Sequence, residues 1–248
     1  MQSLVAWFCL SGEGATLPWT QETVATLHSV INQLKKLLGV ARVRLLDVPC
    51  GDMAWMSRFL QTRDDIDYTG VDIVPDVVRH HQQKFAGSGW RFIEWDVVRD
   101  GLDFSNASFD LIVCRAMLQH LYTADVLRTL AHFSAAPAKY RQRVFLLTTS
   151  FSRHTQNAEL KITDDNPGRF RQLNLELPPI SLVPPLCLVR DGPPDARDAC
   201  FMFLGLWELP LHIVSQCQHV AAFTLRNYGK TLSSCVNWSL KSTKHFSI

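Results

Sequence analysis

The sequence predicts an α/β fold: a doubly wound, mostly parallel sheet with helices on both faces and an antiparallel hairpin at one edge. Short β-branched runs alternate with amphipathic stretches over residues 43–149, as is typical of parallel strands joined by helical crossovers. Polar and glycine residues follow the predicted strands, and a proline-rich segment begins after residue 150. Since such sheets bind ligands beyond the carboxyl ends of their strands, we expect one functional edge there.

Helical and strand periodicities alternate along the first 150 residues. Apolar residues recur at helical spacing over Thr20–Leu38, with Thr20 as the expected N-cap and Gly39 as the C-terminal stop. The remaining predicted elements are the strands Val43–Val48, Tyr68–Ile73, Trp90–Trp95, Phe109–Cys114 and Val144–Thr149, and the helices Met53–Leu60, Pro75–Phe85 and Thr123–Ser134.

The second part of the chain follows a different pattern. Residues 166–194 contain seven prolines, which exclude a helix, and the apolar residues between them predict a strap that lies over the sheet. Two apolar runs, Leu186–Val189 and Phe201–Trp207, predict an antiparallel hairpin at the sheet edge. We predict no helix or strand beyond Pro210.

Composition and charge exclude several classes of protein. The 248 residues include 25 Lys and Arg and 23 Asp and Glu, a net charge of +2, which excludes a disordered chain and a strongly basic nucleic-acid arm. No apolar run approaches the roughly 18 residues of a membrane span. The seven cysteines form no C-x-x-C pair, which argues against a zinc site and a disulfide framework. We therefore expect a cytoplasmic protein without a metal or a membrane contact.

The first predicted strand ends in a candidate binding turn. Asp47, Pro49, Gly51 and Asp52 lie in the run D-V-P-C-G-D between this strand and the next helix. Gly51 allows a ligand to approach the backbone, and the free N–H groups at the start of a helix can donate hydrogen bonds. A carboxylate at Asp47 can accept a hydrogen bond from an ammonium group.

The next three strands also end in polar residues. Asp72, followed by Ile73, ends the second strand 25 residues after Asp47, where a carboxylate can reach a ribose diol. Asp96 and Val97 follow the third strand, where an acid beside a small apolar residue can meet the edge of an adenine. Arg115 follows the fourth strand and is a further cofactor-binding candidate. It pairs with a carboxylate of the cofactor, pairs with an anionic substrate, or balances the charge of Asp96.

In this order and at these intervals, the motifs resemble those of class I S-adenosylmethionine-dependent methyltransferases over about residues 10–210. The resemblance implies that S-adenosylmethionine is the cofactor, with its methionine part at Asp47 and Gly51, its ribose at Asp72 and its adenine at Asp96. A finer resemblance, to a little-characterised methyltransferase group, rests on the runs D-V-P-C-G-D-M-A-W-M, C-R-A-M-L-Q-H-L, L-L-T-T-S-F, R-Q-L-N-L-E-L-P-P and L-G-L-W. The first turn keeps Gly51 of the two or three glycines usual in the family.

The resemblance divides the chain into a methyltransferase domain over residues 1–210 and a basic, unassigned tail over residues 211–248. Within the domain, residues 10–38 correspond to a pre-domain segment and residues 150–194 to a substrate-side strap. The tail contains no Asp or Glu, and we interpret it as a solvated end.

The predicted chemistry requires little of the protein beyond orientation, because methyl transfer is an in-line displacement and a base is needed only when the acceptor loses a proton. Our candidate catalytic residues are His120, Arg171 and Asn174. His120 is alternatively a structural histidine, and Arg171 and Asn174 alternatively belong to a strap that only covers the sheet. Further candidates at the mouth are Thr148, Thr149 and Trp207, of which Trp207 fits a core position better.

The sequence defines the methyl acceptor less closely than the cofactor. An Asn-Pro-Pro-Tyr type motif and a concentrated basic stripe are both absent, which favours a small molecule, a carbohydrate or a protein over a nucleic acid. Two alternatives stay open: a methyltransferase-like binding protein without activity, and a nicotinamide-dependent oxidoreductase. The first turn lacks the G-x-G-x-x-G pattern of dinucleotide-binding folds, which argues against the second alternative.

Overall fold

The computed structural model describes residues 15–104, 106–151, 156–161, 170–192 and 202–213. The basic tail from residue 214, the first residues of the pre-domain segment and parts of the strap lie outside these ranges.

The centre of the molecule is a seven-stranded sheet with the strand order β3-β2-β1-β4-β5-β7-β6. The first five strands are parallel, and β7 pairs antiparallel with both β5 and β6, so the predicted fold class and edge hairpin are confirmed. The order reverses between β1 and β4, and a crevice for a ligand forms beside such a switch point. The strands are β1 Val43–Asp47, β2 Ile66–Asp72, β3 Arg91–Glu94, β4 Leu111–Cys114, β5 Phe145–Phe151, β6 Cys187–Arg190 and β7 Met202–Glu208.

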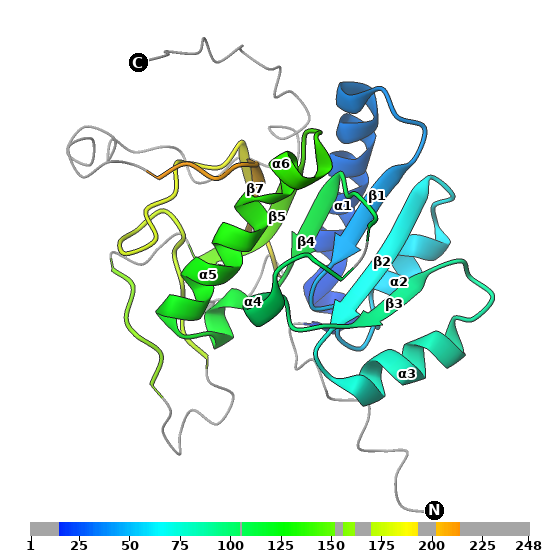
Figure 1. Cartoon of the computed structure of the whole chain (residues 1–248), viewed down its shortest axis with the longest axis horizontal. Coiled ribbons are helices and arrows are strands. Elements are labelled where there is room, and N and C mark those ends of the chain that lie inside the picture. Colours follow the sequence, from blue (N-terminus) through cyan, green and yellow to red (C-terminus); the bar gives the residue numbers. More distant parts are fainter. Residues whose placement is uncertain (1–14, 105, 152–155, 162–169, 193–201, 214–248) are drawn as a thin grey trace, which may run out of the picture.

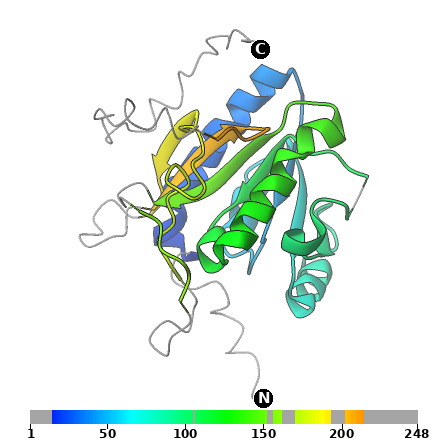
Figure 2. The same ribbon diagram turned by 60° about the vertical axis from the view of Figure 1, so that its left-hand side comes forward.

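Helices cover both faces of the sheet, as Figures 1 and 2 show. One face carries α1 Leu17–Leu38, α2 Met56–Gln61 and α3 Pro75–Lys84; the other carries α4 Val97–Asp100, α5 Thr123–Ser134 and α6 Ala136–Tyr140. A 3-10 turn, η3 Leu118–His120, precedes α5. The elements α4, η3 and α6 were not predicted, because three to five residues are too few to show a helical period.

Each face of the sheet has its own hydrophobic core. Leu27 and Ile31 of α1 pack with Phe59 of α2 on one face. On the other face, Phe133 of α5 packs in one cluster with Leu175 and the following apolar residues of the strap. Residues 173–182 of the strap therefore cover the sheet beside α5, as predicted, whereas residues 187–190 form its edge strand β6. Within the described ranges, no helix combines the length and hydropathy needed to cross a bilayer.

Two predicted helix starts are wrong. The N-cap of α1 is Thr16, four residues before Thr20, because Pro18 suits the first turn, where its missing N–H needs no partner. The start of α2 is Met56 rather than Met53. Met53 has a φ of 60°, which no residue of a right-handed helix adopts. The predicted end of α1 is confirmed, since Gly39 has a φ of 66°.

Candidate functional site

The turn after β1 is built around a buried carboxylate. Asp47 is 3% exposed, and the hydroxyl of Tyr68 on the adjacent strand donates to its Oδ2 at 2.8 Å. Gly51 has a φ of 54°, a left-handed conformation that glycine adopts without steric cost. Pro49 follows Val48 through a cis peptide bond, and Asp52 accepts a hydrogen bond from the Ala54 amide at 2.9 Å.

Asp72 ties the end of β2 to this turn. Its Oδ2 accepts a hydrogen bond from the Gly51 amide at 3.1 Å, and its Oδ1 accepts one from the Val74 amide at 3.0 Å. A carboxylate offers about four lone-pair sites, so each oxygen can accept a further hydrogen bond. The turn also needs Gly70, because a Cβ there would come within 2.9 Å of the Cys50 Cβ. Asp47, Gly51 and Asp72 are thus brought together, as predicted.

Three carboxylates, those of Asp47, Asp52 and Asp72, and the Arg115 guanidinium act on the turn. Burial raises the pKa of Asp47 to about 7 against the lowering effect of the Tyr68 hydrogen bond; the charge of Asp72 contributes to the rise and that of Arg115 opposes it. Burial likewise raises the pKa of the Cys50 thiol far above its usual range, and the charges of Asp47, Asp72 and Asp52 add to this. A cationic ligand is therefore favoured beside the turn and an anionic one is disfavoured.

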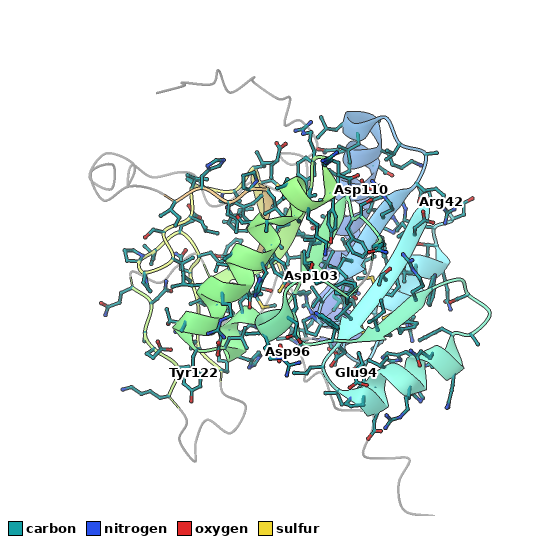
Figure 3. The ribbon with its side chains drawn as sticks, viewed as in Figure 1. Arg42, Glu94, Asp96, Asp103, Asp110 and Tyr122 are labelled. Carbon is teal, nitrogen blue, oxygen red and sulfur yellow. The ribbon has the colours of Figure 1, made fainter. Side chains whose placement is uncertain are left out.

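A small hollow lies beyond the ends of β2 and β3. Its volume is about 260 Å³, and it is lined by Ile73, Glu94, Trp95, Asp96, Arg99 and Asp100. The Ile73 side chain is 59% exposed there. Asp96 caps α4, since its side chain accepts hydrogen bonds from the amides of Val98 and Arg99, whereas Val97 is buried. In Figure 3, Glu94 and Asp96 lie at this end of the sheet, far from Arg42 and Asp110.

Arg115 is held by a residue that the sequence did not indicate. Its Nε lies 2.8 Å from Oδ2 of Asp191, both side chains are almost fully buried, and the hydroxyl of Thr23 in α1 donates to the same carboxylate. The expectation that Arg115 balances Asp96 is wrong, because Asp191, directly after β6, supplies the counter-charge. A contact between Arg115 and a ligand stays a prediction.

His120 lies beyond the carboxyl end of β4, the strand next to β1 in the sheet. It ends η3, its side chain is exposed, and its ring centroid is 5.9 Å from that of Phe170 in the strap. Neighbouring candidates are engaged within the fold: Thr148 donates to the Cys114 carbonyl, and the Thr149 hydroxyl accepts from the Ala116 amide. Trp207 is in the core, as expected, and donates to the Val183 carbonyl.

Arg171 and Asn174 hold the strap in place. The Arg171 guanidinium donates to the carbonyls of Leu121 and Ala158 at 2.8 and 2.6 Å, which binds the strap to the segment between η3 and α5. Asn174 is 6% exposed, and its side-chain oxygen accepts from the Glu176 amide at 2.9 Å. These contacts are structural, and a contact of either side chain with an acceptor stays a prediction.

Four residues of this region were missed: Tyr68, His81, Asn157 and Asp191. Tyr68 and His81 look like ordinary members of a strand and a helix, and Asn157 and Asp191 lie in segments without periodicity. A larger hollow of about 660 Å³ opens elsewhere, at the amino ends of β1 to β3. Of the four arginines that line it, Arg42, Arg44 and Arg63 are paired with aspartates, and we do not assign the site to it.

Comparisons with known proteins agree with this geometry. Residues 46–138 match a family model described as a methyltransferase domain, whereas no curated protein sequence matches the chain. The structure of Burkholderia thailandensis 1,6-didemethyltoxoflavin-N1-methyltransferase, with bound 1,6-didemethyltoxoflavin and S-adenosylhomocysteine, is similar with a TM-score of 0.51 and 21% identity, over 77% of this chain and 80% of that one. PigF with S-adenosylhomocysteine has a TM-score of 0.52 and 12% identity, over 76% of this chain and 55% of that one. At these identities the solved structures show a shared fold.

Proposed function

Since the chain carries a methyltransferase domain of the class I fold, we propose that it transfers the methyl group of S-adenosylmethionine to an acceptor. The observation that carries the proposal is the carboxylate of Asp72, which hydrogen bonds fix at the end of β2 beside a turn that carries the carboxylates of Asp47 and Asp52. A nucleoside with a cationic substituent matches both features.

The residues present fit this cofactor. The oxygens of Asp72 retain lone pairs that can accept from the two hydroxyls of a ribose. The exposed Ile73 side chain and the hollow beside Asp96 offer an apolar surface and a polar rim for an adenine. We assign the methionine part to the turn at Asp47 and Gly51. Its ammonium group is positively charged, and the carboxylates at the turn favour a positive charge.

The same electrostatics argue against a nicotinamide dinucleotide. Its pyrophosphate would lie against the first turn, where Asp47, Asp52 and Asp72 are close enough to raise the pKa of Cys50. A doubly anionic group there would meet like charges, which disfavour its binding.

The cofactor supplies an electrophilic methyl group on a sulfonium, so the residues of the chain need only orient the reactants and exclude water. The hydrogen bond from Arg171 to the Leu121 carbonyl, directly after η3, supports such a role for the strap and η3. His120 is exposed there, and we assign it the role of accepting a proton from an acceptor that loses one.

We favour a small molecule, a carbohydrate or a protein as the acceptor over a nucleic acid. The mouth presents the exposed side chains of His120, Tyr122 and Phe170, whereas the arginine-lined hollow is at the opposite end of the sheet. A phosphate backbone is bound mainly by exposed Lys and Arg side chains, and these three side chains are not of that kind. We place the reaction in the cytoplasm, in keeping with the buried thiols of Cys50 and Cys114, which form no disulfide.

Two measurements test the proposal. Calorimetry with S-adenosylhomocysteine and with a nicotinamide dinucleotide should detect binding of the first alone, and the opposite result would overturn the choice of cofactor. Transfer of a labelled methyl group from S-adenosylmethionine into fractionated cell extract should then identify the class of acceptor. Binding without transfer into any fraction would support the alternative of an inactive binding protein. With an acceptor in hand, His120→Ala, Arg171→Ala and Asn174→Ala should lower turnover while cofactor affinity stays within about 0.5 kcal/mol.

A further inference from the structure

The turn between β1 and α2 contains two residues in the left-handed region. Gly51 has a φ of 54° and Met53 a φ of 60°. A non-glycine residue in this region is uncommon and persists only where its surroundings fix it. Met53 is 2% exposed, and its sulfur lies 3.0 Å from the hydroxyl oxygen of Tyr68. The conformation of the turn therefore depends on groups outside it.

His81 of α3 makes such a contact with the turn. Its Nε2 lies 2.7 Å from the carbonyl oxygen of Gly51, and its side chain is 2% exposed. A carbonyl oxygen can only accept, so Nε2 carries the hydrogen and donates. Asp72 accepts from the amide of the same glycine. Both peptide groups that flank the Gly51 α-carbon are thus held, one by Asp72 and one by His81.

The environment of His81 suits the neutral ring. Its Nδ1 is buried, and the structure describes no hydrogen-bond partner for it. The rings of Phe85 and Phe92 lie 5.8 and 5.2 Å from the imidazole, centroid to centroid. Burial lowers the pKa of His81, and a second N–H in this apolar surrounding would have no acceptor. The Nε2–H tautomer is the form that meets the Gly51 carbonyl.

We propose that His81 is a positioning residue for the cofactor: by fixing the Gly51 carbonyl, it sets the orientation of the turn that receives the methionine part. This inference rests on the proposed function. His81 acts through Gly51 and has no role in the reaction of the methyl group. The helix α3 thereby contributes to cofactor affinity through the turn. The carboxylate that we propose for the ribose, that of Asp72, belongs to the end of β2 and not to this helix.

The affinity test compares matched variants in calorimetry with S-adenosylhomocysteine. His81→Leu removes the donor at similar volume, and we expect its Kd to rise about tenfold, the effect of one lost hydrogen bond. His81→Gln keeps a donor nitrogen at a similar reach and should restore the Kd to within about threefold of wild type. His80→Leu is the control, because His80 is the exposed neighbour on the same helix.

A second readout needs no cofactor. Nitrogen NMR of the ligand-free wild type should show His81 protonated at Nε2, and hydrogen exchange at the Gly51 amide should accelerate in His81→Leu but stay near wild type in His81→Gln. If wild type binds S-adenosylhomocysteine and His81→Leu binds it equally well, the inference is overturned. If wild type binds no S-adenosylhomocysteine, the proposed function fails, and an unchanged Gly51 exchange in His81→Leu would overturn the role of His81 as well. If His81→Leu does not fold, the inference is tested by the tautomer of His81 in the wild type and by the Kd of His81→Gln for S-adenosylhomocysteine.

Discussion

The two sides of the strand-end site are held together differently. On the side proposed for the cofactor, the contacts of Asp72 and His81 with Gly51 join residues 21 and 30 positions apart, within the consecutive elements β1, α2, β2 and α3. On the side proposed for the acceptor, Arg171 reaches back 50 positions to Leu121. Asp191 after β6 reaches 76 positions to Arg115 and 168 positions to Thr23. The contacts of Gly51 can therefore form from neighbouring elements alone, whereas those of Arg171 and Asp191 require the strap and the hairpin to be in place.

The largest expected effect concerns the buried ion pair of Arg115 and Asp191. In Asp191→Asn the buried Arg115 guanidinium loses its counter-charge, and we expect the free energy of unfolding to fall by about 3–5 kcal/mol. Denaturant unfolding measures this loss. Replacing both partners by apolar residues, Arg115→Met with Asp191→Leu, should be much less destabilising, because no charge stays buried. The control is Asp125→Ala, which breaks the more exposed pair with Arg128 and should cost about 0–1 kcal/mol. An equally small loss in Asp191→Asn would refute the importance of the buried pair.

The second prediction addresses the cofactor side. Asp72→Ala should weaken binding of S-adenosylhomocysteine by about 1.5–3 kcal/mol, because it removes a charged acceptor for the ribose hydroxyls. The fold should survive, since the strand-end carboxylate contributes little to either core. Calorimetry measures the affinity, and circular dichroism checks the fold. Asp76→Ala, an exposed acid at the start of α3, should leave the affinity unchanged. A folded Asp72→Ala protein with wild-type affinity would contradict the assignment of Asp72.

The third prediction separates the two sides directly. The side-chain amide of Asn157 donates to the carbonyls of Asn174, Leu177 and Pro178, and its oxygen accepts from the Asn174 amide. Asn157→Ala should destabilise the strap by about 1–2 kcal/mol and accelerate proteolysis within residues 170–192, without a change in cofactor affinity. Asn106→Ala, an exposed asparagine at the opposite end of the sheet, should change neither. Weakened cofactor binding in Asn157→Ala would show that the two sides are coupled.

The smallest effect is a pH dependence on the cofactor side. The pKa of Asp47 is raised by burial to about 7, against about 3.9 in the unfolded chain. Between these values the folded state binds the proton more tightly, so this group's contribution to stability is greatest below pH 4, falls as the pH rises and is constant above 7. From pH 6 to 7 the wild type should lose about 1 kcal/mol more than Asp47→Asn. Parallel pH profiles in denaturant unfolding would disprove the raised pKa.

The elements on the cofactor side were predictable because their signals are local. Buried β-branched runs and helical periods define β1, β2 and α3, and the topology of a parallel sheet brings Asp47 and Asp72 to the same edge. The pairing of Gly51 with Asp72 follows from this arrangement. The length of the turn could not be predicted in this way, because Met53 adopts a left-handed conformation that its residue type does not indicate.

The sequence by itself determined the order of the strands and helices along the chain, the edge hairpin, and the acids and the glycine at the carboxyl edge of the sheet. Only the tertiary structure decided which groups surround them: Tyr68 on Asp47, His81 on Gly51 and Asp191 on Arg115. The physical reason is that residue type and periodicity report the burial of a side chain within its own element. The partner of a buried polar group is set by the packing of elements against each other, and for Arg115 and Asp191 these elements lie 76 residues apart.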